Sequence, residues 1–213
     1  MIRYEKNCLQ ALSSIDRKDG SVKVWKIGHS ETNNEWVQVK GGNFPFIVDV
    51  LNDTPRKSGW TQLELIGVNG TRSPLRFDSP WFSGRSLIVT DHAKRCLEEL
   101  LDENTELLPA RLEGESLWLI HVMSAENCVN QRESVISRTT SGEVRGFFEY
   151  QFNEEAVEPL TLFGIPEEMV CHPLCTDSFK NRVEECGLTG LEFKLVWDSE
   201  LPVGSIVFKS VCV

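Results

Sequence analysis

Residues 90–100 of the chain read TDHAKRCLEEL, and residues 176–186 read TDSFKNRVEEC. Each segment opens with a Thr-Asp pair, whose side-chain oxygens accept hydrogen bonds from the free backbone N–H groups at the start of a helix. The carboxylate also suits the positive end of the helix dipole. The two segments therefore predict two capped amphipathic helices in the C-terminal part of the chain.

The apolar side chains of each segment recur at the 3.6-residue spacing of one helix face. These inner-face residues are Ala93, Leu97, Leu100 and Leu101 in the first helix and Phe179, Val183 and Cys186 in the second. Gly187 is predicted to take the left-handed conformation that ends a helix, with Leu188 packing back against the last turn.

The two segments share Thr, Asp, Lys and two Glu at matching positions, and a strand-like run follows each of them. The runs are Glu106–Leu112 and Leu117–Val122 after the first segment and Leu191–Trp197 after the second. One interpretation is a repeated helix-then-strand unit. The other is that the rules for helix caps and amphipathic faces produce the match by themselves. The sequence leaves both open.

The N-terminal part alternates apolar and polar residues in short runs, which is typical of strands. Such runs occur at Val22–Ile27, Trp36–Val39 and Phe44–Val50. Asn69-Gly70 favours the positive φ angles of a tight turn, so we predict a hairpin between Trp60–Val68 and Thr71–Phe77. A further strand pair is predicted between Val135–Arg138 and Val144–Phe152.

We expect an α+β fold in two closely packed parts. Residues 1–80 are the β-rich N-terminal region, and residues 81–213 are the mixed α/β C-terminal domain with the two capped helices. The junction SPWFSG at 79–84 carries two large aromatic residues, Trp81 and Phe82. They either complete the shared core or present an exposed anchor to a partner.

The formal net charge of −10 argues against a nucleic-acid binder, because such proteins need Lys and Arg to neutralise phosphates. No apolar run is long enough to cross a membrane, and the N-terminus lacks the apolar core of an export signal. We therefore expect a cytoplasmic protein. Its seven cysteines, an odd number, then predict reduced thiols and no disulfide framework.

The charge is distributed unevenly along the chain. Residues 1–80 carry a net charge of +2 and residues 81–213 carry −12, and neither Lys nor Arg occurs between Arg145 and Lys180. The acidic residues of this stretch form either a solvated face or a surface that captures a basic protein partner. The candidate contact residues for such a partner are Glu149, Glu154, Glu155, Glu158, Glu167 and Glu168.

The sequence contains no phosphate-binding loop, nucleophile elbow or zinc-protease motif. The segment Cys171-His172-Pro173-Leu174-Cys175 supplies at most three zinc ligands, and Cys186 adds a fourth if the second helix folds back. We expect small buried thiols here and neither a metal nor a cofactor. The sequence therefore predicts no enzymatic activity.

Three blocks of the C-terminal part resemble an immunity-protein family of bacterial polymorphic toxin systems, the eleventh numbered immunity class. The blocks are SLIVTDHAKRCLEELLDENTELLPARL (86–112), NCVNQRES (127–134) and LTLFGIPEEMVCHPLCTDSFKNRVEECGLTGLEFKLVW (160–197). The resemblance covers about 110 of the 213 residues, and residues 1–80 lie outside it.

The resemblance implies a cytoplasmic antidote that binds and silences a cognate toxin domain through a stoichiometric interface, without chemistry of its own. The acidic surplus fits a basic toxin. The alternatives are an enzyme that reverses toxin damage or uses a metal at Cys171, His172 and Cys175, and a general adaptor module without a toxin partner. A toxin gene immediately upstream is expected only for an immunity protein. The oligomeric state is not indicated.

Overall fold

The structure, a computed structural model, describes residues 20–42, 52–168 and 171–206. Within these ranges it is a β-rich α+β fold with two larger sheets, a separate hairpin and short helices. This coarse class agrees with the prediction. The expected strand Phe44–Val50 lies outside the described residues.

The first sheet is antiparallel and has the strand order β11-β1-β10-β9. Its strands are β1 (Lys23–His29), β9 (Leu162–Phe163), β10 (Leu174–Thr176) and β11 (Leu191–Asp198). The second sheet has the order β2-β3-β5-β6-β4, in which β3 and β5 run parallel. Its strands are β2 (Trp36–Val39), β3 (Leu63–Val68), β4 (Leu87–Thr90), β5 (Thr105–Leu112) and β6 (Glu115–Val122).

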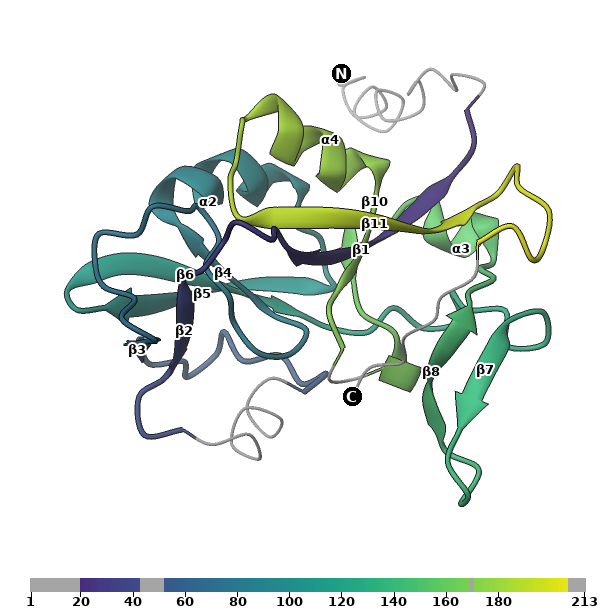
Figure 1. Cartoon of the computed structure of the whole chain (residues 1–213), viewed down its shortest axis with the longest axis horizontal. Coiled ribbons are helices and arrows are strands. Elements are labelled where there is room, and N and C mark those ends of the chain that lie inside the picture. Colours follow the sequence, from purple (N-terminus) through teal and green to yellow (C-terminus); the bar gives the residue numbers. More distant parts are fainter. Residues whose placement is uncertain (1–19, 43–51, 169–170, 207–213) are drawn as a thin grey trace, which may run out of the picture.

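The helices lie mostly on one side of the molecule, where Figure 1 shows α2 and α4 next to each other at the top. The helical elements are α2 (Asp91–Leu97), η1 (Glu98–Leu100), α3 (Glu154–Val157), η2 (Pro166–Glu168) and α4 (Asp177–Glu185). The hairpin of β7 (Val135–Arg138) and β8 (Val144–Glu149) stands at the lower right of the same view. It confirms the predicted strand pair.

Both predicted helices form at their Thr-Asp pairs, but only the first has the predicted side-chain cap. At the start of α4 the Thr176 hydroxyl donates to the Leu160 carbonyl at 2.7 Å and caps no backbone N–H. The Thr90 hydroxyl accepts a hydrogen bond from the Ala93 N–H at 3.3 Å, at the start of α2. Gly187 follows α4 with a φ of +62°. The Leu188 N–H then donates to the Val183 carbonyl at 3.0 Å, which closes the last turn as predicted.

The two helix-then-strand segments are equivalent in the structure as well as in sequence. Helix α2 starts at residue 91 and α4 at 177, while β5 spans 105–112 and β11 spans 191–198, so the helix start and the bounds of the following strand recur 86 residues later. A third strand lies between the strands that flank each helix. It is β6 between β5 and β4 in the first unit, and β1 between β11 and β10 in the second.

The register of the third strands is also the same. Trp118 of β6 pairs with Val89 and Pro109, and Trp25 of β1 pairs with the residues 86 positions later, Cys175 and Leu195. Rules for caps and amphipathic faces act within one segment and do not dictate such a tertiary match. The structure therefore supports the repeated unit, with its third strand supplied from different places in the chain.

Each tryptophan holds its helix against the sheet by contacting the Asp and the Lys that the two segments share. The Trp118 indole N–H donates to Asp91 at 2.6 Å, and the Lys94 ammonium lies 5.2 Å from the centre of the Trp118 ring. In the second unit the Trp25 indole donates to Asp177 at 2.7 Å, and the ammonium of Lys180 lies 5.0 Å from the Trp25 ring. Two of the five residues that the segments share, Asp and Lys, are thus those that join helix to sheet.

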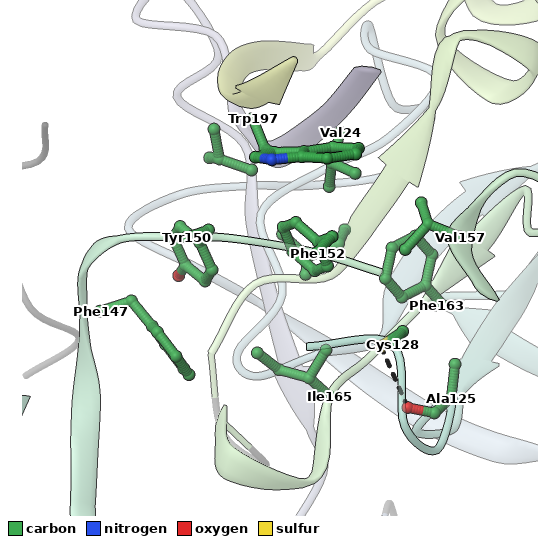
Figure 2. Packing of buried hydrophobic residues seen from close by; sticks show 12 residues of the cluster. Val24, Ala125, Cys128, Phe147, Tyr150, Phe152, Val157, Phe163, Ile165 and Trp197 are labelled. Carbon is green, nitrogen blue, oxygen red and sulfur yellow. Dashed lines mark hydrogen bonds between the residues drawn. The ribbon is translucent and has the colours of Figure 1, made fainter. Parts of the chain in front are cut away.

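The two units bury one apolar cluster between them. Its members at equivalent positions are the pairs Val89 and Cys175, Ala93 and Phe179, and Leu97 and Val183. A second cluster packs β8 and α3 against the first sheet, where the rings of Phe147, Tyr150 and Phe152 follow one another and Trp197 meets Phe152 edge-on (Figure 2). A third cluster fills the other face of the five-stranded sheet.

The predicted division near residue 80 does not separate two groups of strands. Strand β1 lies between β10 and β11, and β3 pairs with β5, so strands from both sides of residue 80 share each larger sheet. The core is therefore built jointly by the two parts of the sequence.

The predicted hairpin at Asn69-Gly70 is wrong in its second strand. The turn forms, with φ angles of +52° and +88° and a Thr71 N–H bond to the Val68 carbonyl. Both edges of β3 are occupied by β2 and β5, so no edge remains for Thr71–Phe77. That segment is held instead by the buried Glu35 carboxylate, which accepts from the N–H groups of Arg76 and Phe77.

A buried arginine ties the end of β6 to the turn after β9. The Arg85 side chain is only 2% exposed, and it donates to the Val122 carbonyl at 2.9 Å and to the Ser124 hydroxyl at 2.7 Å. Its charge is paired with Asp53. A Cβ atom on Gly164 would lie 2.3 Å from Arg85 Cδ, so the guanidinium needs a glycine here.

Replacing either tryptophan by Phe removes one N–H bond to a carboxylate while keeping most of the ring. We expect W25F and W118F each to lower the free energy of unfolding by about 1 kcal/mol. Trp60→Phe is the matched control, because its indole donates to a neutral, exposed carbonyl. Urea unfolding measures all three. A loss in only one of W25F and W118F would contradict their equivalence.

Gly164→Ala should lower the free energy of unfolding by about 1–3 kcal/mol, because the added methyl group overlaps the buried Arg85 side chain. Gly28→Ala is the matched control: a Cβ atom there meets nothing within 4 Å. Thermal unfolding of the two variants gives the comparison. Equal melting temperatures would show that Arg85 is free to move away.

Candidate functional site

The acidic residues predicted to contact a partner divide into two groups. Glu154, Glu155 and Glu158 are exposed on α3 and its C-terminal end. Within the described ranges, none of these three carboxylates forms an ion pair with a Lys or Arg side chain. They form the part of the predicted acidic surface that stays open to solvent.

Glu149 and Glu168 do not belong to an exposed contact surface, contrary to the prediction, because both side chains are buried and hydrogen-bonded within the protein. Glu168 accepts a hydrogen bond from the Tyr150 hydroxyl at 2.8 Å and pairs with the Lys26 ammonium at 3.2 Å. Glu149 accepts from the side chain of Gln151 and from the Gly204 N–H. Burial, followed by the charge of Glu168, raises the pKa of Tyr150 well above its ordinary value. These carboxylates support the fold.

Glu167 is intermediate between the two groups. It is half-buried, and the Gln131 side-chain amide donates to its Oε1 at 2.5 Å. Its Oε2 has no hydrogen-bond partner among the residues that the structure describes. The open acidic surface is therefore centred on α3.

The cysteine segment offers neither a metal site nor an activated nucleophile. Cys171 is disulfide-bonded, so the expectation of reduced thiols is wrong at this position. Cys175 is fully buried, and burial raises its pKa well above the ordinary thiol value, which disfavours the thiolate. The described residues contain no group of three or more His, Cys, Asp or Glu side chains placed to hold a metal.

Two histidines and a tryptophan gather at the end of β1. His29 is 7% exposed and stacks on Trp81 with ring centres 4.5 Å apart, while His172 meets His29 edge-on at 5.8 Å. Burial, and then the neighbouring His172, lower the pKa of His29 to about 4, against a smaller opposite effect of the Pro80 carbonyl. Burial and then Lys26 also lower the pKa of His172. Both rings are therefore neutral at pH 7.

Trp81 is also part of an exposed apolar surface. The sequence had left open whether Trp81 and Phe82 complete the core or face a partner. Trp81 and Trp36 are each 39% exposed and form a backbone bridge with each other, and Ile66 of the neighbouring strand is 37% exposed. Phe82, by contrast, is 2% exposed and belongs to the third cluster. Of the two aromatic residues at the junction, one completes the core and the other faces solvent.

A polar cleft of about 270 Å³ lies beside the Asn69-Gly70 turn. Arg72 and Arg76 line it, but Arg72 pairs with Glu113 and Arg76 with Glu35, so its positive charge is compensated. The lining contains no cysteine, histidine or lysine that could serve as a nucleophile or base.

Comparison with known proteins adds no further constraint: the chain matches no family model and no curated protein sequence. The resemblance to the immunity family therefore stays a prediction from the sequence blocks. No helix in the described ranges combines the length and the apolar character needed to cross a membrane.

The buried His29 should make the protein less stable in mild acid. Its pKa is about 4 when folded and 6.5 when exposed, so below pH 6.5 the unfolded chain takes up a proton that the folded chain refuses. Above pH 6.5, His29 therefore does not lower the free energy of unfolding. As the pH falls toward 4, its titration lowers the free energy of unfolding by up to about 3 kcal/mol.

His29→Phe keeps a ring against Trp81 but removes the titration. The slope of the free energy of unfolding between pH 6.5 and 5.5, measured by urea titration, should be smaller in this variant by about 1 kcal/mol per pH unit. The depressed pKa values of Asp78 and Glu106 act only at lower pH. An unchanged slope would show that His29 does not titrate as described.

Proposed function

We propose that this chain is an immunity-type protein that neutralises a cognate, basic toxin domain by binding it stoichiometrically, with α3 at the centre of the contact. The observation that carries the proposal is the set of exposed carboxylates Glu154, Glu155 and Glu158, which have no ion-pair partner within the described ranges. Lys and Arg side chains of the toxin domain would form ion pairs with these carboxylates.

The placement of these charges favours an external role over a structural one. Glu154 and Glu158 are four residues apart on a helix, a spacing at which like charges repel by about 0.2–0.5 kcal/mol. The buried carboxylates Glu149 and Glu168, by contrast, each accept hydrogen bonds from two internal donors. A cationic surface would relieve the repulsion on α3 and would be steered to it before contact.

The exposed tryptophans are consistent with a protein partner. Trp36 and Trp81 belong to the residue types that dominate protein–protein binding energies, and indole rings also bind Lys and Arg side chains. An enzyme would need a nucleophile or base beside a cleft. The thiol of Cys175 is buried, and the carboxylate that lines the described polar cleft, Glu35, already accepts hydrogen bonds from the N–H groups of Arg76 and Phe77.

Reversing Glu154, Glu155 and Glu158 to Lys tests the contact. With the toxin domain encoded immediately upstream as the partner, we expect the association rate at low salt to fall by about tenfold or more and to depend less on salt. Stopped-flow or surface-binding kinetics at several salt concentrations measures both effects.

The control is a triple reversal of Glu103, Glu143 and Glu192, which are exposed elsewhere and change the net charge equally. It should slow association much less than the α3 reversal. Equal effects of the two triple variants would mean that only net charge matters, and would remove α3 from the contact. Failure of the wild-type chain to form a 1:1 complex with that toxin domain would reject the proposed function itself.

A further inference from the structure

Strand β11, drawn in yellow in Figure 1, is the terminal strand of the first sheet and pairs with β1 on one edge. The equivalent strand of the first unit, β5, has a strand on both edges, β6 and β3. Among the residues that the structure describes, no strand of the second unit takes the position of β3. An edge that carries a further strand in the first unit thus carries none in the second.

Alternate residues of β11 direct their backbone groups to this open edge. At the end of β1, the Ser30 N–H donates to the Gly190 carbonyl at 3.1 Å, so Gly190 and the even-numbered residues after it bond to β1. The Ile27 N–H, by contrast, donates to the Pro173 carbonyl on the β10 side at 2.9 Å. Because neighbouring residues of a strand face opposite edges, the odd-numbered residues of β11 face outward. In the described part of the chain, no backbone partner is bonded to these residues on that edge: Leu191, Phe193 and Leu195.

The segment 191–195 lacks the features that usually prevent an edge strand from pairing. Such strands are commonly interrupted by a proline or a bulge. The segment contains no proline. The irregularity in the pairing of β11 with β1 lies beyond it, where Val24 pairs with Trp197 and Trp25 with Leu195. The open edge is therefore regular over these five residues.

The sequence of this segment, LEFKL, is complementary to itself in the antiparallel direction. When Phe193 faces Phe193 of a second copy, Glu192 faces Lys194 and Leu191 faces Leu195, each in both directions. Opposite charges and aromatic pairs across two strands are stabilising, and like charges are destabilising. A parallel copy in the same register would place Glu beside Glu and Lys beside Lys. The charges therefore favour the antiparallel arrangement.

The backbone and the charges favour the same register. The residues that would form the hydrogen-bonded pairs, 191 with 195 and 193 with 193, are those that face the open edge. Glu192 is exposed, forms no ion pair within the described ranges, and lies opposite Gly28 of β1, which has no side chain. Lys194 lies opposite a like charge, Lys26. A second copy would place an opposite charge on the other side of each.

We propose that β11 is a self-association edge, on which a second copy of this chain pairs antiparallel about Phe193 and joins the two first sheets into one continuous sheet. The inference does not depend on the proposed function, because the carboxylates of α3 belong to a different element. An interface built on one strand edge is small. We therefore expect a reversible dimer that forms at micromolar or higher concentrations of the chain.

Sedimentation velocity of the full chain, from about 1 to about 500 μM, measures this equilibrium. The dimer fraction of the wild-type chain should rise across the range. Glu192→Lys places Lys opposite Lys194 of the second copy, and Lys194→Glu places Glu opposite Glu192. Each variant alone should dimerise about tenfold more weakly or less. An equimolar mixture of the two restores opposite charges at both positions and should associate about as strongly as the wild-type chain.

Glu64→Lys is the matched control. It changes the net charge as much as Glu192→Lys, but Glu64 is exposed on β3, whose two edges are both occupied. It should dimerise like the wild-type chain, and its mixture with K194E should associate more weakly than the mixture of E192K and K194E.

Three results would overturn the proposal: a wild-type chain that stays monomeric at every concentration, single variants that dimerise like the wild-type chain, or a mixture of E192K and K194E that associates no better than either variant alone. The kinetics with a toxin domain are measured at about 0.1 μM or below, under the expected range of the dimer. Reversal of Glu192 in the control for α3 therefore acts there on a monomer.

Discussion

The attachment of α2 and α4 to their sheets through Trp, Asp and Lys is the constraint on which the fold depends. An indole N–H bonded to a first-turn carboxylate fixes the start of each helix over the central strand of its unit. The helix then turns its apolar stripe toward the other unit. The shared cluster of Val89, Ala93, Leu97 and their equivalents follows from that placement.

The same geometry decides which side chains remain outside. Cys96 packs against the margin of this common core, and Cys186, which was predicted on the inner face of α4, is only partly buried at its C-cap. The repeated unit also explains why β1, far away in sequence, is needed. It supplies the central strand that β6 supplies in the first unit.

Carboxylates have two different roles in this acidic chain. Glu35 and Glu168 are buried and accept several hydrogen bonds each, which replaces the solvation that burial removes. The carboxylates of Glu154, Glu155 and Glu158 accept no such bonds from the residues that the structure describes, and they are exposed to solvent. Only the second kind is available to a partner, and this difference limits the proposed contact to a smaller surface than net charge alone would suggest.

Local signals in the sequence predicted local structure well. The Thr90 cap, the Gly187 terminus and the turn at Asn69-Gly70 all form, because each depends on a few neighbouring residues. The strand expected after that turn does not form, since the edges of β3 are already taken by β2 and β5. Competition for a strand edge depends on distant segments and leaves no mark on the turn itself.

The candidate site was only partly predictable for the same reason. Glu149 and Glu154 lie in the same acidic stretch of the sequence. Their neighbouring residues do not indicate that Glu149 accepts a hydrogen bond from the distant Gly204 N–H, whereas Glu154 is exposed. The matched segments did carry a signal, since two of their identical positions, the Asp and the Lys, are those that contact the tryptophans.

The central claim is that the chain acts by covering a partner and performs no chemistry. Its most direct test is a titration of the activity of the cognate toxin domain, which is expected to be encoded immediately upstream, with increasing amounts of this protein. The account predicts that inhibition rises linearly and is complete at one chain per toxin molecule. Complete inhibition at a small fraction of one equivalent, increasing with time, would contradict it and indicate catalysis.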